Sequence, residues 1–160
     1  MEVINRSDSS VTYTVEDLRV RRTFAIGEKK EISEQEVNAL FQQDGGAELI
    51  KHYLLVNDKE WVRNHMPNAP IEYFWQVEDI KKCLLEDDVD LFSETLDYAP
   101  DGVLDLIKTM AWRLPLNDLN KVEALRLKTG FDPLVAAGVM KQPTKTTASA
   151  KPTRRRREEG

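Results

Sequence analysis

The sequence has one cysteine, two histidines and no long hydrophobic run, and each scarcity excludes a class of protein. Cys83 alone forms no internal disulfide and no Cys-x-x-Cys metal site, which suits a reducing compartment. Uninterrupted apolar runs reach only three to four residues. A bilayer-spanning helix needs roughly 20, so we expect no membrane span. The segment Met1–Arg6 shows no basic region followed by an apolar core, and we therefore expect no secretory signal and a cytoplasmic location.

Residues that usually carry catalysis or hold metals are also sparse and scattered. His52 and His65 fall in different predicted elements, and no His-x-x-x-His, His-Glu-x-x-His or Cys/His grouping is present. The Gly45–Gly46 pair lacks the glycine spacing that cradles a phosphate. Cys83 lies on an expected helix, where an inert buried thiol is the usual finding. The sequence therefore indicates no catalytic residue, no metal site and no cofactor.

The densest group of carboxylates, Glu86–Asp88 with Asp90, is the one place where a catalytic hypothesis arises. Paired carboxylates bind divalent cations or divide acid and base roles. These residues also fall at an expected junction between two helices, where aspartates cap the next helix and complement its dipole. We favour capping, and keep an enzyme built on Asp87, Asp88 and Asp90 as the least favoured alternative.

The sequence does contain enough apolar side chains for a folded core, and its charge is uneven. Its 160 residues are 41% hydrophobic and 32% charged, within the range of one soluble domain or one domain plus an appendage. Residues 141–160 hold seven basic and two acidic side chains, a formal charge of +5, so the other 140 residues carry −10. The stretch 142–153 has no large apolar side chain to offset the entropy cost of ordering. We expect a disordered, basic C-terminal arm over residues 141–160.

Residues 1–57 are expected to form a small module of strands and one helix, and the strands come first. Apolar residues alternate with polar ones over residues 11–26, which indicates two or three strands. The Gly27–Glu28 turn is expected to close a hairpin onto residues 29–32.

A helix and a last strand complete this predicted module. Ser33 and Glu36 have the spacing of a capping box, in which each side chain satisfies a free amide at the start of a helix. Asp44–Gly46 is expected to end that helix. After a half-buried turn at residues 49–50, residues 53–56 read as a strand, and the pattern of the module is ββ(β)αβ.

The second part of the chain predicts helices. Residues 58–70 read as a connector, because asparagines and prolines interrupt any regular element there. Residues 71–140 show helical periodicity and predict a compact bundle of four or five short helices. Gly130 is expected just past the end of one of them. The fold class predicted for the whole chain is α+β.

Aromatic residues are concentrated where these two modules meet in the sequence. Tyr73–Trp75, with Trp61, Tyr98 and Trp112, form either an exposed adhesive patch or a buried seam between the modules. We favour the seam, because aromatic side chains supply the largest burial per residue.

The arm carries the candidate contact residues for a partner or a phosphate. Cationic side chains on a flexible segment neutralise backbone phosphates regardless of sequence, or bind an acidic protein surface, either that of the same chain or that of another protein. The acidic pair that follows, Glu158–Glu159, partly cancels this charge. The candidates are Lys151, Arg154, Arg155, Arg156 and Arg157.

Four segments resemble a loosely characterised family of small tailed-bacteriophage proteins. Arg21–Leu40 contains the pattern F-x-x-G-E-x-x-x-I-S-x-x-E, and Leu96–Val103, Lys128–Asp132 and the arginine-rich terminus resemble the same group. The resemblance covers about two-thirds of the chain and carries no catalytic residue. It implies a virion-associated or assembly protein that binds capsid, neck or tail components.

The leading hypothesis is therefore a non-enzymatic structural or adaptor protein of a phage particle. We expect it to bind other phage structural proteins in a homo- or hetero-oligomeric assembly, with no membrane partner, in the virion or the host cytoplasm. The alternative is a nucleic-acid-associated phage protein, for packaging or regulation, whose arginine-rich tail contacts phosphates without sequence preference.

Overall fold

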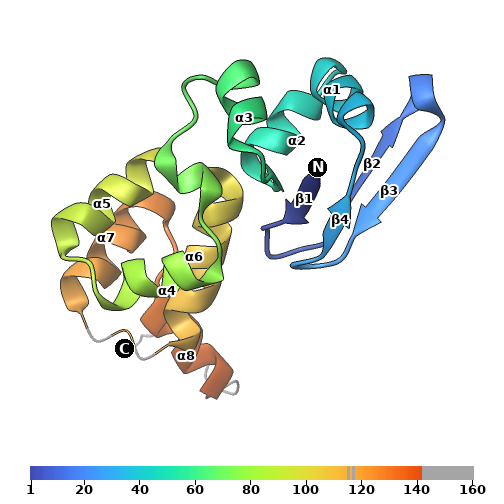
Figure 1. Ribbon diagram of the computed structural model, residues 1–160. Helices are drawn as coiled ribbons and strands as arrows, with labels where there is room; N and C mark the ends of the chain where they lie inside the picture. The colour runs from blue at the N-terminus through green and yellow to red at the C-terminus, as the bar shows by residue number, and fades with distance from the viewer. Residues whose placement is uncertain (115, 117, 142–160) are drawn as a thin grey trace, which may run out of the picture.

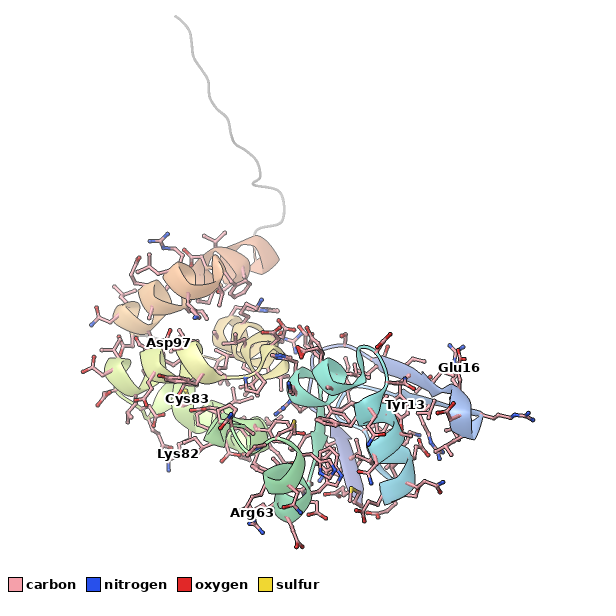
Figure 2. The ribbon with its side chains drawn as sticks, turned by 90° about the horizontal axis from the view of Figure 1, so that it is seen from above. Tyr13, Glu16, Arg63, Lys82, Cys83 and Asp97 are labelled. Atoms are coloured by element: carbon pink, nitrogen blue, oxygen red, sulfur yellow. The ribbon has the colours of Figure 1, made fainter. Side chains whose placement is uncertain are left out.

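A computed structural model describes residues 1–114, 116 and 118–141, and it confirms a mixed α+β fold. Figure 1 and Figure 2 show two modules side by side: an N-terminal module of strands and short helices, and a helical module. We use these names for residues 1–74 and 75–141. Among the described residues, no helix is long and apolar enough to cross a membrane.

The N-terminal module contains two separate small sheets. Strands β1 (Glu2–Asn5), β4 (Lys29–Glu31) and β5 (Leu54–Val56) form an antiparallel sheet in the order β4-β1-β5. Strands β2 (Val11–Val15) and β3 (Val20–Phe24) form a hairpin, joined through the short 3-10 helix η1 (Glu16–Leu18). The apolar side chains of β2 are buried and its threonines exposed, as the alternating pattern predicts.

The hairpin predicted between β3 and β4 is wrong, and β1 was not predicted. The chain turns at Gly27 as expected, but β4 then pairs with β1. The buried side chain of Asn5 explains this, because its amide donates hydrogen bonds to the carbonyls of Phe24 (3.3 Å) and Ala25 (3.1 Å). The link from β3 to β4 therefore wraps around the end of β1.

Helix α1 (Glu34–Gln42) begins as the sequence predicts, but half of the predicted capping box is wrong. The hydroxyl of Ser33 accepts a hydrogen bond from the amide of Glu36 at 3.2 Å. The carboxylate of Glu36 does not bind back to Ser33. It instead accepts hydrogen bonds from Tyr13 and Arg22, on β2 and β3.

Two further helices replace segments predicted to be irregular. Helix α2 (Gly46–His52) occupies the predicted half-buried turn, and Gly45 enables its start by adopting a left-handed backbone conformation with φ of 79°. Helix α3 (Lys59–His65) lies within the predicted connector, capped by Asp58 and ended before the prolines. The prediction that no regular element forms there is wrong.

The helical module consists of five short helices in the described part of the chain, in agreement with the expected number. Asp88 and Asp118 cap the second and fourth, and Gly130 follows the fourth with φ of 77°. The segment between the modules is the 3-10 helix η2 (Ile71–Phe74). The five helices are α4 (Val77–Leu85), α5 (Val89–Tyr98), α6 (Asp101–Arg113), α7 (Leu119–Thr129) and α8 (Pro133–Lys141).

Each module has its own apolar core. The N-terminal core runs from Val3 to Tyr73 and includes side chains of α3, so this helix belongs to that module. The helical core runs from Ile80 to Leu125. Hydrogen bonds cross the boundary between the two cores from Asp101 to His52 and from Thr109 to Asp8.

Candidate functional site: the groove between the modules

Arg6, which directly follows β1, joins the end of α2 to η2 beside the boundary between the modules. Its side chain is only 4% exposed. The guanidinium donates hydrogen bonds to the carbonyls of Lys51 (3.2 Å) and His52 (3.2 Å) at the end of α2, and to the carbonyl of Tyr73 in η2. The last carbonyls of a helix lack partners within the helix and carry partial negative charge, so Arg6 caps α2.

The charge of Arg6 is compensated without an acidic partner among the described residues. Besides the three carbonyls, the guanidinium lies 4.6 Å from the centre of the Tyr73 ring, within range of a cation–π interaction. Burial lowers the pKa of Arg6 to about 10. The side chain therefore remains protonated at neutral pH and holds α2 and η2 together.

His52 fastens the first turn of α6 to the end of α2. Its Nδ1 accepts a hydrogen bond from the backbone amide of Asp101 at 3.0 Å. A Cβ atom at Gly102 would lie 2.3 Å from the carbonyl oxygen of His52, so only glycine permits this close approach. The same carbonyl accepts a hydrogen bond from Arg6. The peptide group of His52 therefore contacts residues of both modules.

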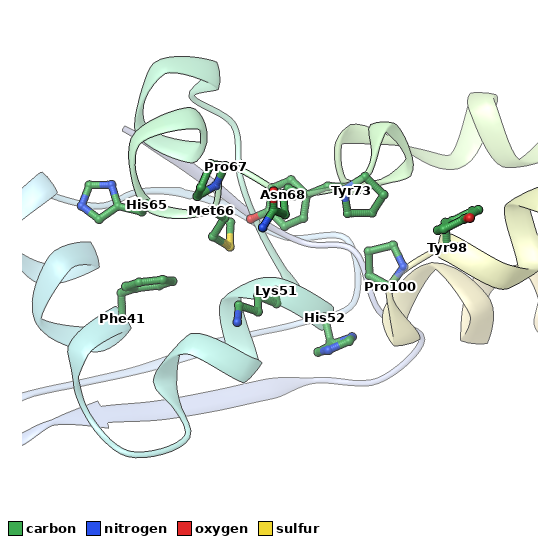
Figure 3. A pocket seen from close by; sticks show the side chains of 13 residues that line it. Phe41, Lys51, His52, His65, Met66, Pro67, Asn68, Tyr73, Tyr98 and Pro100 are labelled. Carbon is green, nitrogen blue, oxygen red and sulfur yellow. The ribbon is translucent and has the colours of Figure 1, made fainter.

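These contacts border a groove with a volume of about 390 Å³. Figure 3 shows α2, with Lys51 and His52, on one side of the groove, and the segment that carries Met66 and Asn68 on the other. Tyr98, at the end of α5, lies at one end and is 63% exposed. The lining residues are Phe41, Lys51, His52, His65, Met66, Pro67, Asn68, Ala69, Pro70, Tyr73, Tyr98, Ala99 and Pro100.

The side chain of Tyr73 supports the groove from inside the N-terminal core. Its hydroxyl accepts from the amide of Val56 at 3.0 Å and lies 3.1 Å from the carbonyl of Ile50. Burial raises the pKa of Tyr73 to about 12, so the phenol is neutral at physiological pH. Tyr73 therefore fixes η2 to β5 and α2.

The other aromatic side chains of the groove differ in their freedom to bind a partner. The ring of His65 stacks on Trp61 with 4.2 Å between centroids, and its Nδ1 lies 2.9 Å from the Trp61 carbonyl. Phe41 contacts both rings edge to face. Tyr98 forms no such stack among the described residues. The groove thus combines a fixed aromatic wall with one exposed tyrosine.

The seam predicted for the aromatic residues is correct in part. Tyr73 and Trp61 are buried in the N-terminal core, and Phe74 packs against that core. Trp75 packs against the helical core instead. Tyr98 is exposed at the groove, so its assignment to a buried seam is wrong.

The acidic cluster and the lone cysteine have structural surroundings. Asp88 accepts a hydrogen bond from the amide of Leu91 at 2.9 Å, which is the capping role that the sequence favours. Cys83 is 1% exposed, and burial raises the pKa of its thiol to about 11. Within the described ranges, no group of three potential metal-ligating side chains comes together.

The structure brings together two histidines that the sequence analysis did not assign to any site, and it adds one residue that sequence reasoning missed. His52 and His65, which the sequence places in different elements, both line the groove. Arg6 was missed, and nothing in its local sequence distinguishes it from a surface arginine after a short strand. The predicted contact residues Lys151, Arg154, Arg155, Arg156 and Arg157 lie outside the described residues.

The chain was also compared with known proteins. No protein-family model matches it, and no match was found among curated proteins or solved structures.

Proposed function

We propose that this chain is a non-enzymatic adaptor protein of a tailed-phage particle, a component of the capsid, neck or tail that binds neighbouring virion proteins. The observation that supports an adaptor role is the groove at the module boundary, whose lining residues come from both modules. The assignment to a phage particle rests on the sequence resemblance. Its location is accordingly the virion or the host cytoplasm.

The groove suits an extended segment of a neighbouring protein. Its wall combines aromatic rings with three prolines, and Lys51 and Asn68 supply polar groups beside them. Aromatic side chains contribute large contact areas at little entropy cost, and extended segments commonly dock in grooves lined by such side chains. Arg6 and His52 hold the two walls in place, which lowers the ordering cost of binding.

The basic arm adds a second contact in this proposal. Residues 141–160 carry +5 while the other residues carry −10, so the arm favours an acidic partner surface. Lys151 and Arg154–Arg157 are the side chains that would make the contact. A segment that orders only on binding can wrap a neighbour in an assembly.

Quantitative mass spectrometry of purified particles from the phage or prophage that encodes the chain tests this function. We expect a fixed copy number close to that of a ring or shell protein. Absence of the chain from particles, together with abundance in infected cells, would overturn the proposal.

A matched pair of variants tests the role of the groove. Tyr98→Ser removes the exposed ring at the groove and should lower incorporation into particles. Leu91→Ser changes another exposed side chain of α5 that does not line the groove, and should leave incorporation unchanged. Equal incorporation of wild type and both variants would contradict a contact through the groove.

The arginine run favours a second candidate function, contact with nucleic acid for packaging or regulation. Each phosphate that a cationic side chain neutralises makes the affinity for duplex DNA fall more steeply with salt. The measurement is a salt titration of binding to random-sequence duplex, comparing the full chain with a variant that carries glutamine at Arg154–Arg157. Absence of binding at low salt would exclude this candidate.

A further inference from the structure

The hairpin β2–β3 has one covered edge and one open edge. Helix α1 packs against β2, and the side chain of Gln43, at the end of α1, donates a hydrogen bond to the carbonyl of Thr14 at 2.7 Å. Among the described residues, β3 has no strand partner other than β2, and Figure 1 shows the hairpin at the outer side of the N-terminal module. An edge strand presents unpaired backbone groups and is a template for another strand.

The register of the hairpin identifies which backbone groups of β3 face outward. In an antiparallel pair, opposite residues alternate between pairs that share backbone hydrogen bonds and pairs whose amides and carbonyls point away from each other. Thr14 gives its carbonyl to Gln43, so the pair Thr14–Arg21 is of the outward kind. The hydroxyls of Thr12 and Thr23 approach to 3.0 Å, as expected for a pair of the same kind. The open edge therefore carries the amides and carbonyls of Arg21 and Thr23.

The open edge of β3 is basic, whereas the chain as a whole carries −5. Arg19 and Arg21 are exposed, and neither forms an ion pair among the described residues. Arg22 pairs with Glu36 of α1, and β3 contains no acidic residue. The acidic residues of the hairpin lie in η1 at its outer end, where Figure 2 labels Glu16. The edge thus combines unpaired backbone groups with uncompensated positive charge.

We propose that this edge binds an extended acidic segment of another protein, which adds a third strand to the hairpin. Arg21 and Thr23 exchange backbone hydrogen bonds with the added strand, as in other cases of strand addition. On the exposed face, acidic side chains of the segment lie beside Arg21. On the opposite face, apolar side chains of the segment lie beside the half-buried Val20. The segment therefore alternates acidic and β-branched residues.

Charge selects another protein rather than a second copy of this chain. Pairing β3 with β3 of a second copy places arginines of both copies on one short ladder, where like charges repel. Strand β4 carries Lys29 and Lys30, and residues 141–160 carry +5, so neither suits this edge. The arginines that oppose self-association therefore favour an acidic partner. This contact does not depend on the groove.

Titration of the ¹⁵N-labelled full chain with a synthetic peptide, in which valine and glutamate alternate over seven residues, tests the contact by nuclear magnetic resonance. We expect the amides of Arg21 and Thr23 to exchange hydrogen rapidly in the free chain and about tenfold or more slowly with saturating peptide. A peptide with lysine in place of glutamate should bind about tenfold or more weakly. The glutamate peptide methylated on every backbone nitrogen should not bind, because it has no amide to donate.

A charge reversal on the edge tests the selectivity. Arg21→Glu should weaken binding of the glutamate peptide by about tenfold or more and strengthen binding of the lysine peptide. Arg63→Glu is the matched control, because it makes the same change in charge at an exposed position of α3. It should leave both affinities unchanged, and circular dichroism should show that both variants are folded.

Three results would overturn the proposal: no binding of the glutamate peptide, equal binding of its methylated form, or equal binding by Arg21→Glu. Slow exchange of the Arg21 and Thr23 amides in the free chain would overturn it as well, because the edge would then already be paired. A chain found in particles that does not bind the peptide would reject this contact and leave the adaptor function standing. Peptide binding by a chain that is absent from particles would do the reverse.

Discussion

Both modules bury a cation that caps a helix, Arg6 in one and Lys121 in the other, but the N-terminal module also buries a carboxylate in an ion pair. In the N-terminal module, the carboxylate of Glu36 receives two hydrogen bonds of 2.8 Å from Arg22 and one of 2.6 Å from the hydroxyl of Tyr13. In the helical module, the ammonium of Lys121 donates to the carbonyls of Cys83 (3.3 Å) and Leu84 (2.9 Å) at the end of α4. The first is an ion-pair network, and the second caps a helix.

The difference follows from how the elements of each module are connected. The hairpin β2–β3 shares no ladder with the other sheet, so side chains must attach it to α1. The Glu36 network does this by joining three elements. Packed helices already satisfy their own backbone groups except at their ends, where a single cation suffices. We therefore expect the N-terminal module to depend more on its buried polar groups.

Glu36→Gln should have the largest effect on stability. It removes the charge that faces Arg22, and because water reaches that 39% exposed guanidinium, the cost is about 2–3 kcal/mol in the free energy of unfolding. Urea denaturation measures this cost. Glu34→Gln, on the exposed side of the same helix, should change stability by less than about 0.5 kcal/mol. Similar losses for both variants would contradict the special role of Glu36.

The same network predicts a dependence on pH. The hydrogen bonds from Arg22, followed by the one from Tyr13, hold the pKa of Glu36 below its ordinary value of 4.5. The carboxylate therefore stabilises the fold fully above that value, and this contribution is lost as pH falls through the lower folded-state pKa. The stability difference between wild type and Glu36→Gln should shrink below about pH 4.5. If the stability difference between wild type and Glu36→Gln stayed constant down to pH 2, the ionised Glu36 carboxylate would not be the stabilising group.

Arg6→Met should come next, at about 2 kcal/mol, because it leaves the carbonyls of Lys51, His52 and Tyr73 without their donor. Because His52 at the end of α2 accepts a hydrogen bond from Asp101 of α6, loosening α2 should also weaken the attachment of the helical module. We expect the single unfolding transition of the wild type to separate into two, followed by tryptophan fluorescence and by circular dichroism. A single unshifted transition would show that Arg6 does not hold the end of α2 in place.

Tyr73→Phe tests one buried hydroxyl in the N-terminal core. The variant leaves the amide of Val56 without its acceptor, and an unpaired buried donor costs about 1–2 kcal/mol. Thermal unfolding measures the loss, with Tyr98→Phe as the control because Tyr98 is exposed. No difference between the two variants would mean that water replaces the missing hydroxyl.

Lys121→Met should have the smallest effect on the free energy of unfolding, and it tests the comparison between the two modules most directly. The variant removes a cap from α4 but also ends the burial of a charge, so the two changes nearly cancel to within about 1 kcal/mol. Chemical denaturation of Lys121→Met beside Arg6→Met compares the two buried cations. A larger loss of stability for Lys121→Met than for Arg6→Met would contradict the expectation that the N-terminal module depends more on its buried polar groups.

Local signals in the sequence predict much of the fold. Ser33, Asp88 and Gly130 mark helix ends through contacts with residues two to four positions away, and the structure has each helix end at that place. The alternation of Val11, Tyr13 and Val15 likewise identifies β2. Such signals are readable because both partners of each contact lie within a few residues.

The missed elements depend on partners far away in the chain. Strand β1 is only four residues long, and most of it is buried, so it shows no alternation. Helix α2 begins at a glycine pair that resembles the end of the preceding helix. The groove was missed for the same reason, because Arg6, His52 and Tyr73 are far apart in the sequence and meet only in the folded chain.

The pairing of β1 with both β4 and β5 has a consequence for biosynthesis. Strand β1 precedes β5 by about 50 residues, yet it lies between its two partners in the sheet. At typical translation rates of about 5–20 residues per second, β1 waits for roughly 3–10 seconds before β5 has been made. During that interval only β4 can pair with β1, so the edge of β1 that later binds β5 stays open and the nascent chain carries an unpaired strand edge.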